Sequence, residues 1–291
     1  MKFALALSMC DPSHYLPLAK AAEESGWDAV CVPDGGPWTE QTAVPYRGGT
    51  RWWGPDTPFL DPFVVIPAMA AVTQRIRFYT NVFKLPLRSP LLTARAVASA
   101  SALSGGRVAL GIGLGWNRDE FDALGVDYEA RAERMDEAIE ILKLVWSGEM
   151  VEFHGRHFDF APLSQSPVPT GPVPLYVGGD SKPALRRAAR FADGWCSRAP
   201  GVDDVIEMLP RMREALAREG REGEPFELMA MCPEAVEADP LRRLAEAGVT
   251  EAQVWPWNRD GVDLGDLPGK LDSVRRFAQE VIEPFREPAG D

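Results

Sequence analysis

A glycine-rich stretch, LSGGRVALGIGLGW from Leu103 to Trp116, is the strongest candidate for chemistry in this chain. Five of its fourteen residues are glycine, and glycine is selected where φ must be positive or where a backbone approaches another group closely. The pair Gly105-Gly106 fits a helix end and a turn. The later glycines, at positions 111, 113 and 115, end a short apolar strand, where α/β proteins bind their ligands. We therefore expect a flat cofactor against this loop, with Gly113 among its contacts.

A second segment, Val177-Gly178-Gly179-Asp180-Ser181, has the form of a strand end, a glycine turn and a helix start. Free backbone N–H groups and the helix dipole make such a turn a natural phosphate site. Gly178, Gly179 and Ser181 are therefore candidate phosphate ligands, and Arg198, after the next expected strand, could supply a balancing charge. The same residues are equally typical of an ordinary βα turn, and Arg198 of a surface arginine, so both alternatives stay open.

Side chains that act as nucleophiles or bases are scarce. None of the histidines, His14, His154 and His157, follows an expected strand, so neither a histidine triad nor a histidine-rich metal site is expected. The four cysteines are widely spaced, at positions 10, 31, 196 and 232, and are expected to be reduced core thiols. Asp34, just before two glycines, is the best-placed acid, with a turn or capping role as its alternative. So few reactive groups suit an enzyme whose cofactor carries the reactive atom.

Tryptophans gather near the same expected strand ends. They are Trp38, Trp52, Trp53, Trp116, Trp255 and Trp257. Indoles at loop positions suit a wall for a flat apolar ligand, although packing within the loops is the alternative.

The composition bounds the class of protein. The 291 residues are 45% hydrophobic and 25% charged, which is ordinary for a globular enzyme. The net charge of −12 argues against a nucleic-acid or anionic-membrane surface, and no apolar run is long enough to span a bilayer. The N-terminal MKFALALSMC resembles a signal peptide only briefly, so we expect a first core strand there. We expect a cytoplasmic, single-domain protein over residues 1–291 that acts on a small molecule.

Strand-like runs alternate with helical ones along the whole chain. The eight expected strands are Lys2–Ser8, Trp27–Pro33, Ile76–Val82, Val108–Ile112, Val173–Val177, Gly194–Ser197, Phe226–Met231 and Glu251–Trp257. Eight strands with helices between them in fewer than 300 residues predict an α/β fold, the (β/α)8 TIM barrel. A doubly wound sheet is the rival, but Gly111-x-Gly113-x-Gly115 lacks the G-x-G-x-x-G spacing of a dinucleotide site.

The helices between these strands carry their own start and stop signals. Ser89-Pro90 has the order of an N-cap followed by proline at the first helical position. Between the fourth and fifth strands we expect an amphipathic helix, Glu129–Trp146, and a short hairpin, Gly148–Phe160. Five prolines between Pro162 and Pro174 then form a connector rather than a domain linker. The predicted barrel therefore contains an insertion between strands 4 and 5.

Three segments together resemble the bacterial luciferase-like superfamily of flavin- or deazaflavin-dependent oxidoreductases. They are RIRFYTNVFKLPLRSPLLTARAVASASALSGGRVALGIGLGWNRDEFDALG, ERMDEAIEILKLVWSGEMVEFHGRHFDF and PLYVGGDSKPALRRAARFADGW. With the first strand and helix, the resemblance covers about Met1 to Arg198. The TNV-x3-PLR-x-P variant is most similar to the branch that uses coenzyme F420.

The resemblance implies a (β/α)8 barrel with an insertion, a dimer, and specific cofactor contacts. A bulge with a non-proline cis peptide at the end of the third strand would back the isoalloxazine ring, here at Asn81 and Val82 after Thr80. The cofactor phosphate would lie near Gly178, Gly179, Ser181 and Arg198, and Trp38 matches an aromatic wall over the ring.

The chain departs from the F420-dependent sugar-phosphate dehydrogenases of this superfamily at two positions. These enzymes carry Asp-His after the second strand and a glutamate after the Gly-x-Gly loop, where this chain has Asp34-Gly35 and Gly115-Trp116. Oxidation of a sugar phosphate is therefore not expected, and Trp116 predicts an apolar wall.

The resemblance leaves three hypotheses. The first is an oxidoreductase in which F420 exchanges hydride with a small, largely apolar substrate, while Asp34 or water handles the proton. The second is a reduced-FMN monooxygenase. The third is an inactive binding barrel.

Overall fold

The computed structural model describes residues 1–40, 42–46, 51, 53–197, 201–233 and 236–286. Eight parallel strands close into a barrel: β1 (Lys2–Ala6), β2 (Ala29–Val32), β3 (Arg77–Thr80), β5 (Val108–Gly113), β8 (Leu175–Gly178), β9 (Gly194–Ser197), β10 (Glu227–Met231) and β11 (Glu251–Val254). The first strand, β1, pairs with the last, β11, and β3 pairs with β5, so the eight strands form a closed ring. The predicted (β/α)8 barrel is confirmed, and the doubly wound sheet is excluded.

Four expected strands end earlier than the sequence suggested, and two of them, the third and the eighth, bear on the site. The third stops at Thr80 and resumes after two residues as β4 (Phe83–Lys84), which also pairs with β5. The eighth ends at Val254, and the chain turns at once into helix α9 (Pro256–Asp260). Trp257 is therefore a buried helix residue and not a strand-end residue, because Pro256 lacks the N–H that a continued strand would donate.

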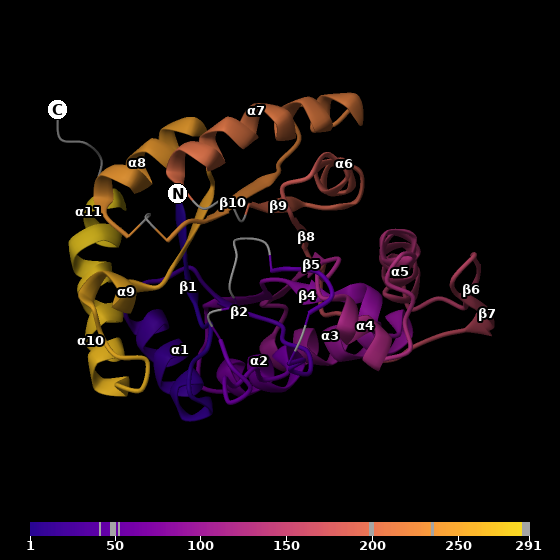
Figure 1. Ribbon diagram of the computed structural model, residues 1–291, viewed down its shortest axis with the longest axis horizontal. Helices are drawn as coiled ribbons and strands as arrows, with labels where there is room; N and C mark the ends of the chain where they lie inside the picture. Colours follow the sequence, from indigo (N-terminus) through magenta and orange to yellow (C-terminus); the bar gives the residue numbers. More distant parts are fainter. Residues whose placement is uncertain (41, 47–50, 52, 198–200, 234–235, 287–291) are drawn as a thin grey trace.

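Helices surround the barrel on its outer face (Figure 1). They are α1 (Tyr15–Glu24), α2 (Pro62–Ala70), α3 (Pro90–Ser104), α4 (Arg118–Ala123), α5 (Arg131–Val145), α6 (Lys182–Phe191), α7 (Val202–Arg218), α8 (Ala238–Ala247), α10 (Leu267–Phe277) and α11 (Glu283–Arg286). Ser89 caps α3 through the N–H of Leu92, as predicted, and Gly105 ends it in the left-handed conformation at φ 69°. None of the described helices is both apolar enough and long enough to cross a bilayer.

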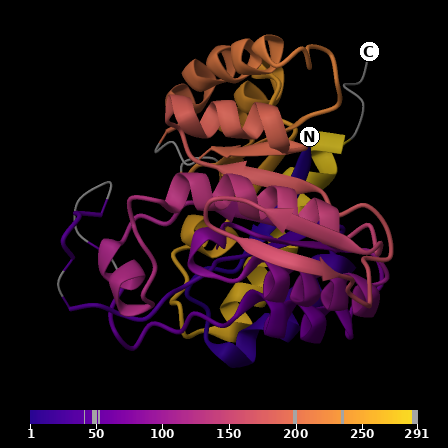
Figure 2. The same ribbon diagram turned by 90° about the vertical axis from the view of Figure 1, so that its right-hand side faces the viewer.

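The insertion between the fourth and fifth barrel strands is an antiparallel hairpin of β6 (Val151–His154) and β7 (Asp159–Leu163). Figure 1 and Figure 2 show it on the outside of the barrel, next to α5. Glu137 of α5 accepts the backbone N–H groups of Arg156, His157 and Phe158 at 2.8, 3.0 and 3.1 Å. One helix carboxylate therefore holds the hairpin turn, and the predicted insertion is confirmed.

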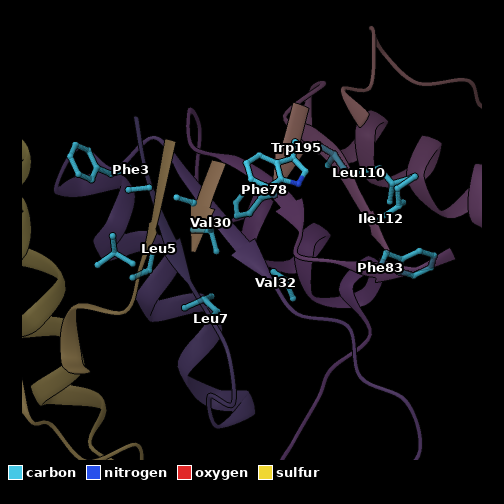
Figure 3. Close-up of a cluster of buried hydrophobic side chains, with 14 of the residues drawn as sticks. Phe3, Leu5, Leu7, Val30, Val32, Phe78, Phe83, Leu110, Ile112 and Trp195 are labelled. Carbon is cyan, nitrogen blue, oxygen red and sulfur yellow. The ribbon is translucent and has the colours of Figure 1, made fainter. Parts of the chain in front are cut away.

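The barrel strands alternate between two cores. Large apolar side chains such as Phe3, Leu5 and Phe78 point outward against the helices (Figure 3). The lumen is lined mainly by small residues, with two tyrosines: Ala4, Ala6, Ala29, Cys31, Tyr79, Ala109, Tyr176, Cys196 and Met229. All four cysteines are buried, so their predicted place in the core is confirmed.

Ion pairs occupy the amino-terminal end of the lumen. Lys2 Nζ lies 2.5 Å from Glu227 Oε1, and Arg77 Nη2 lies 2.7 Å from Glu251 Oε2. Burial raises the pKa of the Glu251 carboxyl, while Arg77 opposes that shift. Charged side chains therefore line one end of the barrel, and the candidate site lies at the carboxyl ends of the strands.

Candidate active site

The third barrel strand is interrupted by a bulge at the mouth of the barrel. The peptide bond between Asn81 and Val82 is cis, as the family resemblance implied. The Val82 side chain fills space that two neighbouring strands leave free. A Cβ added at Gly113 would lie 2.6 Å from Val82 Cγ2, and one at Gly178 would lie 2.9 Å from Val82 Cγ1. Glycine is therefore required at both positions to make room for the bulge.

Gly111 and Thr80 hold the base of the bulge. A Cβ at Gly111 would lie 2.0 Å from the Thr80 carbonyl oxygen, and the Thr80 hydroxyl donates to the Gly111 carbonyl at 2.6 Å. Thr80 is fully buried, so its side chain supports the bulge from below. The glycine spacing signals close approach, as predicted, but the segment approached at these positions is the chain's own third strand.

Asn81 reaches across the mouth. Its side-chain amide donates to Gln253 Oε1 on β11 at 2.6 Å and lies 3.5 Å from Met231 Sδ on β10. Asn81, Val82 and Met231 are half-buried, as is Trp255 after β11. The mouth therefore presents an apolar floor that solvent reaches, with a fixed amide at its centre.

Asp34 lies after β2, as predicted, but both carboxylate oxygens are already bound. Arg88 donates to Oδ1 at 2.7 Å and to Oδ2 at 2.8 Å, and the Lys84 N–H donates to Oδ2 at 2.8 Å. The Asp34 side chain is 1% exposed. Burial raises the pKa of this carboxyl, and the Arg88 charge opposes the rise. The geometry fits an anchor that ties the loop after β2 to β4.

A second ion pair lies on the other side of Lys84. Lys84 Nζ contacts Glu120 Oε2 of α4 at 2.6 Å. A Cβ at Gly36 would lie 2.6 Å from Glu120 Cδ, so the loop after β2 packs directly on this pair. Sequence reasoning missed Lys84 and Glu120, since 36 positions separate them and neither belongs to a recognised motif. The signal in the sequence that could have identified Lys84 is a single charged residue within an otherwise apolar strand end.

Several of the aromatic residues expected at the mouth pack on one another, which is the alternative that the sequence left open. The Trp116, Tyr46 and Trp53 rings meet edge to face, with centroids 5.2 and 5.0 Å apart, and Phe59 follows at 6.3 Å. Trp38 is 37% exposed, and the Arg51 guanidinium stacks 3.7 Å from its ring centroid. Trp52 lies outside the described residues. Aromatic packing thus joins the loop after β2 to the loop after β5.

The turn after β8 has the predicted form. Gly179 has φ 120°, and Ser181 is the N-cap of α6, accepting the Ala184 N–H at 3.4 Å. Gly178 and Gly179 are half-buried, but the Gly179 N–H donates to the Cys196 carbonyl at 3.3 Å and the Gly179 carbonyl accepts the Trp195 indole N–H at 2.7 Å. Pro183 lacks an N–H, which leaves the start of α6 with fewer free donors than an ordinary phosphate turn. Arg198 lies outside the described residues.

None of the three histidines ends a barrel strand, as predicted. His154 contacts Asp159 within the hairpin, which raises the pKa of its imidazole, and His157 contacts Glu133 of α5. His14 is buried at the start of α1, and burial lowers the pKa of its ring. Among the described residues no group of three potential metal ligands occurs.

A family model described as luciferase-like monooxygenase matches residues 6–277. The chain belongs to this family. An uncharacterized protein of Mycobacterium tuberculosis is 37% identical to this family member over 288 residues, 97% of this chain and 99% of that protein. The F420-dependent glucose-6-phosphate dehydrogenase of Nocardia farcinica is 28% identical over 246 residues, 82% of this chain and 69% of that enzyme.

Solved structures agree with the luciferase-like fold. Coenzyme F420 dependent tetrahydromethanopterin reductase from Methanopyrus kandleri superposes with a TM-score of 0.77 over 98% of this chain and 99% of that chain. The two sequences are 19% identical, so the match shows a shared fold. Luciferase-like family members are oxidoreductases or monooxygenases.

Proposed function

We propose that this protein is an F420-dependent oxidoreductase that transfers hydride between the deazaflavin and a small, largely apolar organic substrate. The observation that carries the proposal is the bulge at Asn81 and Val82, seated on Gly113 and Gly178 at the open end of the barrel. Val82 offers an apolar side chain there, and the Asn81 amide is fixed by its bond to Gln253. We propose that a planar heteroaromatic ring packs on these residues.

The residues at the mouth fit this cofactor. Asn81 and Val82 would back the ring, with Thr80 and Gly113 holding the bulge in place. The turn at Gly178 and Gly179 would lie against the phosphate of the tail, and the Ser181 hydroxyl would donate to it. When bound, F420 supplies or accepts a hydride, so the protein needs to position the reactants and exclude water.

The walls of the mouth support an apolar substrate. Trp116 stands where related sugar-phosphate dehydrogenases carry an acid, and its ring packs against Tyr46. A hollow is lined by Met9, Gly54, Asp56, Thr57, Pro58 and Leu264, four of which lie between Trp53 and Phe59 in the chain. We propose that Trp38 and Trp116 contact the substrate. We also propose that Asp34 anchors the loop after β2, which carries Trp38, and does not exchange protons.

The alternative is a reduced-FMN monooxygenase, which the description of the family model favours. Titration of the purified protein with F420 and with FMN, followed by ligand fluorescence, separates the two. We expect saturable F420 binding that is lost in Asn81→Trp, while Lys20→Met on exposed α1 binds normally. Binding of FMN without F420 would favour the monooxygenase, and binding of neither would favour an inactive barrel.

We also propose a homodimer that buries the outer face of α2 and α3. The two helices pack side by side. In α2 no residue is charged, and in α3 only Arg95 is. Val64 and Leu92 are 72% and 65% exposed on this face. An exposed apolar surface of this kind marks a contact with another chain. The buried thiols of Cys10, Cys31 and Cys196 support the proposed cytoplasmic location.

A further inference from the structure

The ion pair of Lys84 and Glu120 lies at the mouth. Lys84 comes directly after Phe83 and two residues after Val82. Its orientation follows from strand register, in which Phe83 pairs with Ile112 and Lys84 with Gly113. Paired residues of parallel strands point to the same face of the sheet. Phe83 and Ile112 belong to the core between barrel and helices. Lys84 therefore points with Gly113 to the lumen side, where the ring would lie.

The pair is shielded from water but not sealed. The side chains of Lys84 and Glu120 are 12% and 8% exposed. A Cβ added at Gly115 would lie 3.7 Å from Lys84 Cδ. The backbone of Gly36 packs directly against the Glu120 carboxylate. The pair thus lies between the two loops that carry Trp38 and Trp116.

Two other charges face Lys84, and they bind each other. Asp34 accepts the Lys84 N–H, and Arg88 donates to the Lys84 carbonyl at 3.3 Å. Both are joined in the bidentate ion pair described above, so Glu120 is the carboxylate that holds the Lys84 ammonium.

We infer that Lys84 is the proton donor for reduction of the substrate, and that Glu120 positions it; this inference rests on the proposed function. A conjugated carbonyl compound that receives a hydride at its β-carbon becomes an enolate and needs one proton. The Lys84 N–H bond breaks as a C–H bond forms at the α-carbon, and the amine regains a proton from water. A lysine on a flexible stem can act in this way as a general acid. Asp34 cannot, because Arg88 and the Lys84 N–H engage both of its oxygens.

The test compares wild type with Lys84→Met, Lys84→Arg and Glu120→Gln, with Lys20→Met as the control for loss of an exposed lysine. Three quantities are measured: F420 affinity by fluorescence, reduction of cyclohex-2-en-1-one by reduced F420, and acetylation of each lysine by acetic anhydride with and without F420. We expect Lys84→Met to bind F420 within about threefold of wild type and to lose about 10²–10⁴-fold in turnover. Lys84→Arg should keep part of the rate, with an altered pH dependence. Bound F420 should protect Lys84 from acetylation but not Lys20.

Turnover of Lys84→Met within threefold of wild type would overturn the inference, as would unchanged acetylation of Lys84 when F420 is bound. If wild type binds F420 but does not reduce the enone, the acetylation result alone decides. If Lys84→Met fails to fold, as judged by its melting temperature, Lys84→Arg and Glu120→Gln decide. Failure of wild type to bind F420 refutes the proposed function instead, so the two failures are distinct.

Discussion

The fit between Val82 and Gly113 predicts the outcome of a double-mutant cycle. In Gly113→Ala, the added Cβ would lie 2.6 Å from Val82 Cγ2, about 1 Å closer than a favourable carbon–carbon contact. Overpacking of this size costs about 1–3 kcal/mol of unfolding free energy. Val82→Ala removes two methyl groups from a half-buried site and costs about 1 kcal/mol. If this contact causes the destabilisation in Gly113→Ala, the double variant loses about 1–3 kcal/mol less unfolding free energy than the two single variants lose together.

Urea denaturation followed by fluorescence measures these free energies, and F420 titration of the same variants reports whether the bulge has moved. Gly171→Ala is the matched control, because a Cβ there meets nothing within 4 Å, and its free energy of unfolding should stay within about 0.5 kcal/mol of wild type. Additivity of the Gly113 and Val82 changes within about 0.5 kcal/mol would refute the reasoning. Glycine at position 113 would then be needed for a ligand or for a backbone conformation, and not to make room for Val82.

Three further predictions follow from single contacts. Arg88→Met leaves the Asp34 carboxylate buried without its cation and should cost about 3–5 kcal/mol in urea denaturation, with partial recovery in Arg88→Met/Asp34→Asn; no recovery would mean that Arg88 acts through other contacts. Glu23 is partly desolvated, which raises the pKa of its carboxyl, but three backbone N–H groups at 74–76 outweigh this and hold the pKa below that of an ordinary glutamate. Its contribution to stability should therefore be present above the ordinary glutamate pKa and lost as pH falls through the lowered folded-state pKa. Glu23→Gln should then lose less stability than wild type between pH 6 and pH 3, and identical acid profiles would contradict this. Leu92→Glu should convert a dimer to a monomer in light scattering, whereas Leu124→Glu at the C-cap of α4 should not. A dimer that survives Leu92→Glu would place the interface elsewhere.

The sequence by itself determined the strand order and the class of fold. The alternation in KFALA, with Phe3 and Leu5 on one face and alanines on the other, matches a strand buried on both sides of a barrel wall. Helix ends could also be predicted, because Ser89, Gly105 and Ser181 cap their helices through bonds to residues within four positions. Interactions over so short a distance depend on local spacing, which the sequence displays directly.

Only the tertiary structure decided what each candidate residue contacts. Gly111 and Gly113 could be recognised from the sequence as positions of close approach. Which groups approach them, the third strand at Gly111 and Val82 at Gly113, depends on how β3, β4 and β5 lie side by side. Asp34 and Arg88 are 54 positions apart, and their pairing changes the best-placed acid into an anchor. Lys84 and Glu120 meet across 36 positions to form a charged pair that no motif contains. Such contacts depend on how the barrel closes, because closure brings distant segments together and buries their charges.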